Sequence, residues 1–149
     1  MKKIFAAVLL ASTFFVQHAS AQDVHKSQVP SLIINNFQKA FPKVYDVEWE
    51  LEGENYKAEF ETGLFSTDHD AWYSKTGKLI RHKEEISKND LPKKVLAKLS
   101  NSFSSYRVED VKKITENNKV TYTLELKTFT EEWKAAFDNA GNILSKVAD

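Results

Sequence analysis

Two stretches of the chain place apolar residues at steps of four, which is the spacing of one face of an α-helix. The two stripes consist of Val29, Ile33, Phe37 and Phe41, and of Leu91, Val95, Leu99 and Phe103. Helix-start residues precede both, Ser27 before the first stripe and Asn89-Asp90 before the second, and proline is tolerated in a first turn. Pro42 ends the first helix just after its last apolar residue. The pattern predicts two amphipathic helices.

After each helix the apolar period changes from about four to two. Val47, Trp49 and Leu51 alternate with glutamates, and after a turn at Gly53 the alternation resumes in residues 56–60. The second half turns at Asn117-Asn118 and alternates again in residues 120–126, and glycines 77 and 141 mark the turns of two closing hairpins. Alternation with one polar side predicts antiparallel strands whose second face meets water.

The two halves of the chain repeat each other. Val29-Pro30 is matched by Leu91-Pro92, and the sequence of residues 71–80 aligns with that of residues 135–144 at an offset of 64 positions. We therefore predict an α+β fold in which residues 22–86 and 87–149 form two tandem helix-plus-antiparallel-strand repeats. The repeats share one sheet in one compact domain, and the helices pack on one face to bury their stripes. The opposite face of the sheet is then open to a partner.

Residues 1–21 have the pattern of a cleaved signal peptide. Lys2 and Lys3 precede an apolar stretch from Ile4 to Val16, and Ala19-Ser20-Ala21 offers small residues for cleavage before Gln22. A membrane anchor is the alternative, but a span needs about 20 unbroken apolar residues. We expect a secreted periplasmic protein with no membrane span after signal cleavage. The absence of cysteine removes disulfides, thiol catalysis and cysteine zinc sites.

The charge of the chain argues against a nucleic-acid partner. Removing Lys2 and Lys3 from the 21 basic and 21 acidic residues of the full sequence leaves 19 against 21, a net charge near −2. A nucleic-acid-binding domain normally has a strong basic excess. The length of the mature chain is that of one ordinary domain, which we expect to be a monomer.

Several short motifs occur in an order that resembles a known family. They are Val29-Pro30, Phe37, Phe41-Pro42, Val47-Glu48-Trp49-Glu50, Tyr56-Lys57-Ala58-Glu59-Phe60, Asp90-Leu91-Pro92 and the strand from Tyr122 to Leu126. Together they resemble the PepSY-like family of periplasmic proteins over nearly the whole mature chain. The resemblance implies a fold similar to β-lactamase inhibitor protein and a secreted binding or inhibitory module, with no catalytic residues. One departure is the stretch 62–69, which is longer than its counterpart 128–131.

Residues that could bind a metal or catalyse a reaction are few. Asp68-His69-Asp70 is the candidate metal cluster, but neighbouring strand residues point to opposite faces, so a solvated turn is the alternative. Glutamates at positions 48, 50, 52 and 54 form a ladder. A buried member could serve acid–base chemistry; otherwise they line a wet face with cross-strand partners such as Lys57. We predict no cofactor and no enzymatic activity.

Three aromatic residues are candidate binding residues. Trp72 has the opposite strand parity to Ala71 and Tyr73 and should point to the open face, while Phe65 and Phe129 lie near hairpin tips. Exposed aromatics often anchor a partner, although packing under a loop is the alternative. We predict a non-enzymatic module that binds an unknown periplasmic protein or peptide, as an inhibitor or modulator of an envelope protein or protease. The alternative is a periplasmic carrier of a small ligand or metal ion.

Overall fold

The computed structural model describes residues 21–148 of the 149-residue chain. The predicted signal peptide, residues 1–21, lies outside the described residues except for Ala21. The predicted cleavage point before Gln22 falls inside the first strand, β1 (Ala21–Asp23). None of the helices within residues 21–148 is long and apolar enough to cross a membrane.

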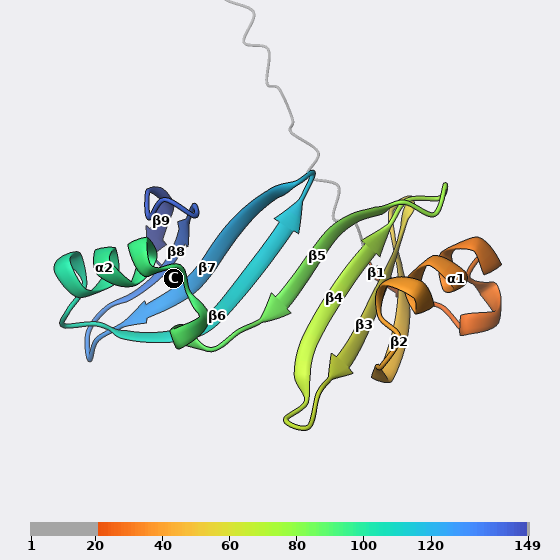
Figure 1. Ribbon diagram of the computed structural model, residues 1–149, viewed down its shortest axis with the longest axis horizontal. Coiled ribbons are helices and arrows are strands. Elements are labelled where there is room, and N and C mark those ends of the chain that lie inside the picture. Colours follow the sequence, from red (N-terminus) through yellow and green to blue (C-terminus); the bar gives the residue numbers. More distant parts are fainter. Residues whose placement is uncertain (1–20, 149) are drawn as a thin grey trace, which may run out of the picture.

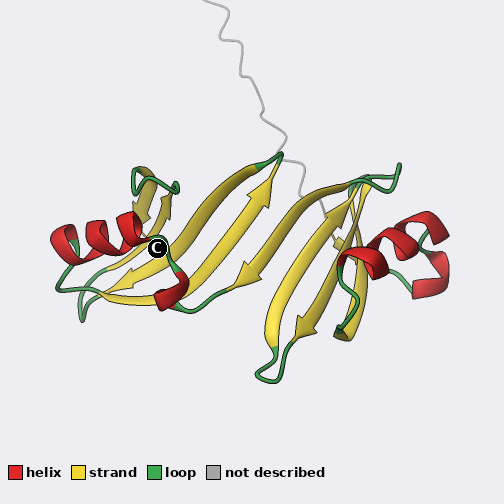
Figure 2. Cartoon of the chain, in the orientation of Figure 1, coloured by secondary structure: helices red, strands yellow, loops and turns green. Residues whose placement is uncertain are grey.

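One antiparallel sheet organises the described residues, and its strands follow one another in chain order from β1 to β9 (Figures 1 and 2). Helix α1 (Ser31–Ala40) connects β1 to β2, and α2 (Lys93–Ser102) connects β5 to β6. The strands after β1 are β2 (Tyr45–Glu52), β3 (Asn55–Thr62), β4 (Thr67–Tyr73), β5 (Leu79–Glu85), β6 (Arg107–Glu116), β7 (Lys119–Lys127), β8 (Glu132–Phe137) and β9 (Ile143–Ala148).

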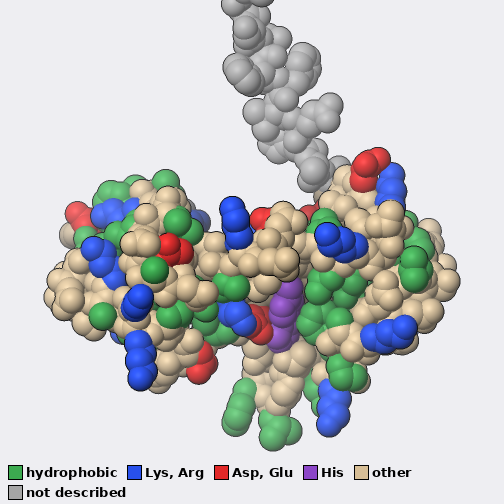
Figure 3. Space-filling view, turned by 45° about the horizontal axis from the view of Figure 1, so that its top comes forward, with side chains coloured by type: hydrophobic (Ala, Val, Ile, Leu, Met, Phe, Trp, Pro, Cys, Tyr) green, Lys and Arg blue, Asp and Glu red, His purple; other side chains and the backbone are tan. Residues whose placement is uncertain are grey.

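The predicted fold class is wrong. We expected an α+β fold of two helix-plus-strand repeats, but residues 21–148 form one nine-stranded antiparallel sheet that carries only two ten-residue helices. A ten-residue helix is about 15 Å long, whereas nine strands spaced by about 4.8 Å make a sheet roughly 40 Å wide. The helices therefore cover only parts of the sheet, and histidine side chains are visible midway between the two ends of the molecule (Figure 3).

Both helices begin just after a proline, Pro30 or Pro92, which occupies the N-cap position with extended backbone. Ser27, predicted as a helix-start residue, lies instead within a short 3-10 turn, Lys26–Gln28. The predicted start residues of the second helix, Asn89 and Asp90, lie in the corresponding turn, Lys88–Asp90. These turns precede the helices because proline fixes its own φ and disfavours helical backbone in the residue before it.

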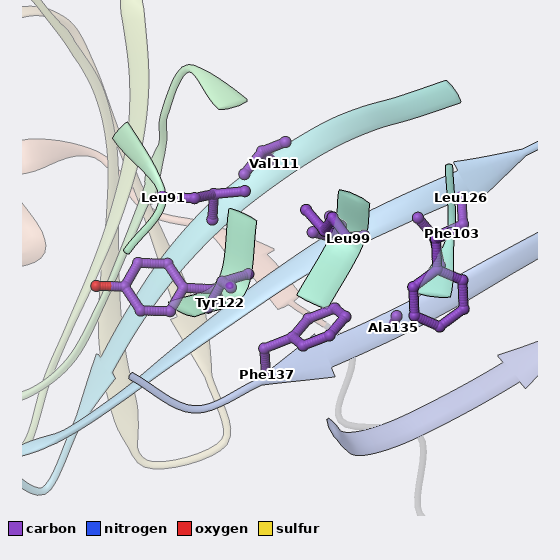
Figure 4. Close-up of a cluster of buried hydrophobic side chains, with 10 residues drawn as sticks. Leu91, Leu99, Phe103, Val111, Tyr122, Leu126, Ala135 and Phe137 are labelled. Atoms are coloured by element: carbon purple, nitrogen blue, oxygen red, sulfur yellow. The ribbon is translucent and has the colours of Figure 1, made fainter. Parts of the chain in front are cut away.

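Each helix buries its apolar stripe against its own part of the sheet. Under α1, Ile33 and Phe37 pack on β2, β3 and β4, and the Phe37 ring lies edge-on to Trp49 and Phe60 at centroid distances of 5.2 and 5.0 Å. Helix α2 buries its stripe, including Leu99, against β6, β7 and β8 (Figure 4). The buried residues form two separate clusters, so the central strands between them are less covered.

Cross-strand register places both helices on the same face of the sheet. Ala71, which packs under α1, pairs with His82, which pairs with Thr115, which pairs with Val120, and Val120 packs against the cluster under α2. Paired residues on neighbouring strands point to the same side. We call this side the helix face and the other side the open face.

Local irregularities recur at a spacing of 64 positions. Asp46 in β2 and Asp110 in β6 both have positive φ, 46° and 49°, and each lies at a register shift between its strand and the next. Further register shifts follow Trp72 in β4 and Ala136 in β8. The division into repeats at 22–86 and 87–149 stays a prediction, and this spacing supports it.

Candidate functional site

The open face of the sheet carries most of its charged side chains. Glu50, Lys57, Trp72 and Arg81 form one cross-strand row from β2 to β5. The row points away from the helices, because side chains alternate along a strand and Ala58, next to Lys57, is buried under α1. A partner that approached this face would meet a charged surface.

A groove of about 530 Å³ lies over this face and extends from β2 to β6. Three lysines line it, Lys57, Lys83 and Lys112. Its eight carboxylates belong to Asp46, Glu48, Glu59, Glu61, Asp68, Asp70, Glu85 and Asp110. Eight carboxylates against three ammonium groups give the lining a formal charge of −5. We call this feature the acidic groove.

All three lysines of the acidic groove are engaged by carboxylates of the same chain. Lys57 lies 3.2 Å from Glu50, and Lys112 lies 2.7 Å from Asp110, while Lys83 contacts Asp70. Burial acts to lower the pKa of Lys57, but its hydrogen bonds to Glu59 and Glu50 outweigh that effect and hold the pKa above its ordinary value. The lysines therefore do not offset the remaining acidic groups.

Five groove carboxylates have no ion pair within the described part of the chain: Asp46, Glu48, Glu61, Asp68 and Glu85. Glu61 and Asp68 stand directly opposite each other on β3 and β4. Like charges in directly opposed positions repel and destabilise a sheet. A cation placed between them would relieve this repulsion, so this part of the groove favours the binding of a positively charged group.

The structure places Trp72 on the open face, but it does not expose the ring. Trp72 is 9% exposed, and its indole Nε1 donates a hydrogen bond of 2.8 Å to Glu52 Oε2. The Arg81 guanidinium lies 4.6 Å from the ring centroid, with Lys57 and Lys83 farther away. The Trp72 ring thus lies beneath a layer of charged side chains. Its predicted role as a binding anchor stays a prediction.

The two other predicted anchors lie at exposed hairpin tips. Phe65, between β3 and β4, is 94% exposed, and Phe129, between β7 and β8, is 107% exposed. Phe65 lines a hollow together with Glu85, which also lines the acidic groove. Phe129 lines neither cavity. The three predicted anchors therefore do not form one patch, but Phe65 adjoins the acidic groove.

The predicted metal cluster Asp68-His69-Asp70 is divided between the two faces. Asp68 pairs across the open face with Glu61, whereas His69 pairs with Phe60 on the helix face. His69 meets two residues that the sequence analysis did not connect with it. Its Nδ1 lies 3.1 Å from His82 Nε2 and 4.0 Å from a Glu84 oxygen. The signal that could have found this set is the β4–β5 hairpin, which pairs His69 with Glu84.

The two histidines should make the protein less stable in mild acid. Burial lowers the pKa of both His69 and His82 below the ordinary value of 6.5, and the neighbouring Glu84 only partly opposes this. The unfolded chain therefore binds more protons than the folded chain below that value, and the free energy of unfolding falls as the pH drops through it. We expect urea titrations at about pH 7.5 and pH 5.5 to show this loss.

The contribution of the histidines can be separated from that of the carboxylates. His82→Gln should reduce the difference in unfolding free energy between the two pH values, because one buried imidazole no longer resists protonation. His25→Gln, at an exposed position, should leave the difference as in the wild type. Equal pH dependence in all three proteins would contradict the argument.

The glutamate ladder on β2 resembles a charge-paired sheet face more than a catalytic centre. Glu50 and Glu52 lie 3.2 and 3.7 Å from Lys57, so the predicted cross-strand pairing with this lysine is confirmed. Glu54 lies beyond the strand, with its side chain 83% exposed beside Lys75. Glu48 is exposed. Acid–base catalysis commonly relies on a carboxyl group that burial has perturbed, and the ladder offers no fully buried member.

The sequence matches one family model over most of its length. The family is described as "Putative beta-lactamase-inhibitor-like, PepSY-like", and the matches cover residues 16–81 and 54–145. No curated protein sequence matches the chain.

Solved structures from Bacteroides share the fold at low sequence identity. A "BLIP-like protein" from Bacteroides fragilis NCTC 9343 is 19% identical with a TM-score of 0.68, over 80% of this chain and 85% of that one. A "putative periplasmic" protein from Bacteroides eggerthii DSM 20697 is 14% identical with a TM-score of 0.71, over 80% and 88%. A DUF2874 family protein from Bacteroides uniformis ATCC 8492 is 15% identical with a TM-score of 0.69, and the match covers 80% of this chain and 88% of that one.

Proposed function

We propose that this chain, which belongs to the PepSY-like, beta-lactamase-inhibitor-like family, is a non-enzymatic periplasmic module that binds another protein. The family and a structural relative named as BLIP-like support a binding role over catalysis. The leader pattern of residues 1–21 and a relative described as periplasmic support the location. In this proposal the bound partner is an envelope protein or protease whose activity the module inhibits or modulates.

The acidic groove is the observation that carries the proposal. Its lining has a formal charge of −5, and its lysines are already occupied by carboxylates of the same chain. Complementary charge steers association and fixes the register of a complex. The partner we propose therefore presents a basic loop or segment, whose lysines or arginines enter the groove. The same charge repels phosphate, which agrees with the expected absence of a nucleic-acid partner.

Phe65 supplies the apolar contact beside this groove. Its ring is almost fully exposed at the tip of the β3–β4 hairpin, and Glu61 and Asp68 lie on the two strands of the same hairpin. A solvent-exposed aromatic next to a charged surface is typical of binding hot spots. A stable complex needs on the order of 800 Å² per partner, so the hairpin tip and the groove would be buried together.

The other two predicted anchors have different places in the proposal. Phe129 lies at the corresponding tip in the second half of the chain, 64 positions after Phe65. It would contact a partner only if that partner extends along the sheet to β7 and β8. Trp72 would act through the charged side chains that cover it, because its ring is 9% exposed. We expect Phe65→Ser to weaken binding more than Phe129→Ser or Trp72→Ala.

Reversing one groove charge should weaken binding without weakening the fold. In Asp68→Lys the new ammonium faces Glu61 across β3 and β4, so repulsion becomes attraction and the free energy of unfolding should be unchanged or slightly higher. Binding of a basic partner should fall about tenfold, and more at low salt. The partner is first captured by crosslinking in living cells. Its dissociation constant is then measured for wild type and variant at two salt concentrations.

A matched variant separates the groove from the total charge of the chain. Asp90→Lys makes the same change of charge in the exposed turn before α2, outside the acidic groove. It should bind the partner like the wild type at each salt concentration. Equal affinity of Asp68→Lys and the wild type, or a partner that carries no basic surface, would refute the proposal.

A further inference from the structure

The helix face holds a cluster of potential metal ligands between the two cores. His69 on β4 and both His82 and Glu84 on β5 each place one ligand atom within 4.8 Å of the others. Histidine side chains are visible at the surface midway along the molecule, beside acidic and basic groups (Figure 3). The cluster lies where neither ten-residue helix covers the sheet fully, so His82 and Glu84 are only partly buried.

We propose that His69, His82 and Glu84 bind one divalent transition-metal cation of the zinc class. Two imidazole nitrogens and one carboxylate oxygen are a ligand set that zinc accepts, with a fourth position left for water or another ligand. Calcium and magnesium prefer sites built from oxygen alone. His69 is among the residues that line the acidic groove. Its side chain nevertheless points to the opposite face from Asp68 and Asp70, so the proposed ligand atoms lie on the other side of the sheet.

The spacing of the two nitrogens fits one shared metal ion. His69 Nδ1 and His82 Nε2 are 3.1 Å apart. Two nitrogens bound to zinc at about 2.0–2.1 Å in tetrahedral geometry are about 3.3 Å apart. The Glu84 oxygen lies 4.0 Å from His69 Nδ1, so its side chain must approach by less than about one ångström to become the third ligand.

Neighbouring groups already orient these ligands. Thr62 Oγ1 lies 2.7 Å from Nε2 of His69, and the Phe60 ring is nearly parallel to the imidazole at 7°, so Nδ1 is held toward His82. Lys113 Nζ donates a hydrogen bond of 2.9 Å to Glu84 Oε1, which leaves Oε2 on the histidine side. Supporting contacts of this kind fix the ring orientation of metal-binding histidines and raise affinity.

The protonation of the cluster is compatible with metal binding. The pKa of each imidazole is lowered, mainly by burial, so both rings are neutral near pH 7 and retain a lone pair. In the metal-free protein one ring nitrogen donates a hydrogen bond to the other across the 3.1 Å contact. Metal binding requires that donor to move its proton to its second ring nitrogen. For His69 that nitrogen faces Thr62, whose hydroxyl accepts a hydrogen bond as readily as it donates one.

Zinc titration of the purified protein tests the site. We expect one Zn²⁺ per chain by native mass spectrometry and calorimetry. His82→Gln and Glu84→Gln should each raise the dissociation constant by about tenfold or more, since each removes one ligand. Substitution with Co²⁺ should give the visible bands of a four-coordinate ion, which His82→Gln should abolish. His82 is chosen over His69 because it is less buried, and circular dichroism confirms that each variant is folded.

Two controls distinguish this site from other zinc ligands of the chain. His25→Gln removes an exposed histidine near the first strand, and Asp68→Asn removes the neighbouring carboxylate that faces the other side of the sheet. Both should bind Zn²⁺ like the wild type. No zinc binding by the wild type, unchanged affinity in His82→Gln, or an equal loss in Asp68→Asn would overturn the proposal.

Discussion

Phe37→Ala is expected to lower the free energy of unfolding by about 3–5 kcal/mol, the loss usual for a large aromatic residue in a core. Phe37 is 3% exposed, and its ring meets Trp49, Phe60 and Tyr73 edge-on at centroid distances of 5.2, 5.0 and 6.4 Å. Alanine would remove these contacts and leave a cavity between α1 and the sheet. Urea titration should show the loss, and the melting temperature should fall by roughly 10–20 °C.

Phe65→Ala is the matched control for this experiment, because it removes the same side chain from an exposed hairpin tip. Its effect on the unfolding free energy should stay within about 0.5 kcal/mol. The pair therefore measures what burial under α1 adds to stability. Equal losses in the two variants would contradict the packing of α1 on β2, β3 and β4.

The helices could be predicted from the sequence because their signals are local. Two residues of each predicted stripe, Ile33 and Phe37 in α1 and Val95 and Leu99 in α2, are the residues that the helices bury. The turn at Gly53, between two runs of alternating residues, and the hairpin turn at Gly77 were also predicted, and both glycines have positive φ in the structure. Local spacing fixes which residues one element buries, and this part of the fold needs no knowledge of long-range contacts.

The relative weight of sheet and helix could not be predicted in the same way. Strand β1 contains only three residues and pairs with β2 through Gln22 and its neighbours, at a position where the sequence shows no alternation. Sheet pairing is a long-range property, and short edge strands give little sequence signal. The prediction therefore gave the helices too large a share of the fold. It also missed how much of the sheet the two helices leave uncovered.

The candidate sites depended on cross-strand register, which sequence spacing does not give. His69 and Glu84 are 15 positions apart in the sequence and directly paired in the β4–β5 hairpin, where a register shift follows Trp72. The burial of Trp72 has the same origin, because its cover comes from Lys57 and Arg81 on the two neighbouring strands. Strand parity gave the correct face for Trp72, but parity alone says nothing about what lies on top of a side chain.

The uncovered centre of the sheet links the fold to its two proposed sites. Because α1 and α2 are short, β5 lies between the two cores, and its side chains reach both faces. Lys83 and Glu85 point into the acidic groove, whereas His82 and Glu84 point to the helix face. Because side chains alternate along the strand, β5 contributes to the charged docking surface on one face and to the cluster of metal ligands on the other. The two proposals can therefore be tested independently.

Gly141→Ala is expected to be the most damaging glycine substitution, at about 3 kcal/mol or more. Gly141 lies in the β8–β9 turn with φ of 81°, and an added Cβ would stand 2.7 Å from the Lys94 carbonyl oxygen and 2.9 Å from its carbon. Backbone atoms at the start of α2 cannot turn aside as a flexible side chain can. The helix and the hairpin would have to separate, which would disturb the cluster around Leu99 and Phe137 (Figure 4).

Gly63→Ala isolates the part of this loss that comes from backbone conformation. Gly63 has φ of 74°, close to that of Gly141, but an added Cβ there meets nothing within 4 Å. Its substitution should cost about 1–2 kcal/mol, the usual penalty for a side chain in the left-handed region. The difference between the two variants in urea titration measures the close approach of α2 to the β8–β9 turn. If the two losses are equal, that approach is absent in solution, because only the contact with Lys94 distinguishes the two positions.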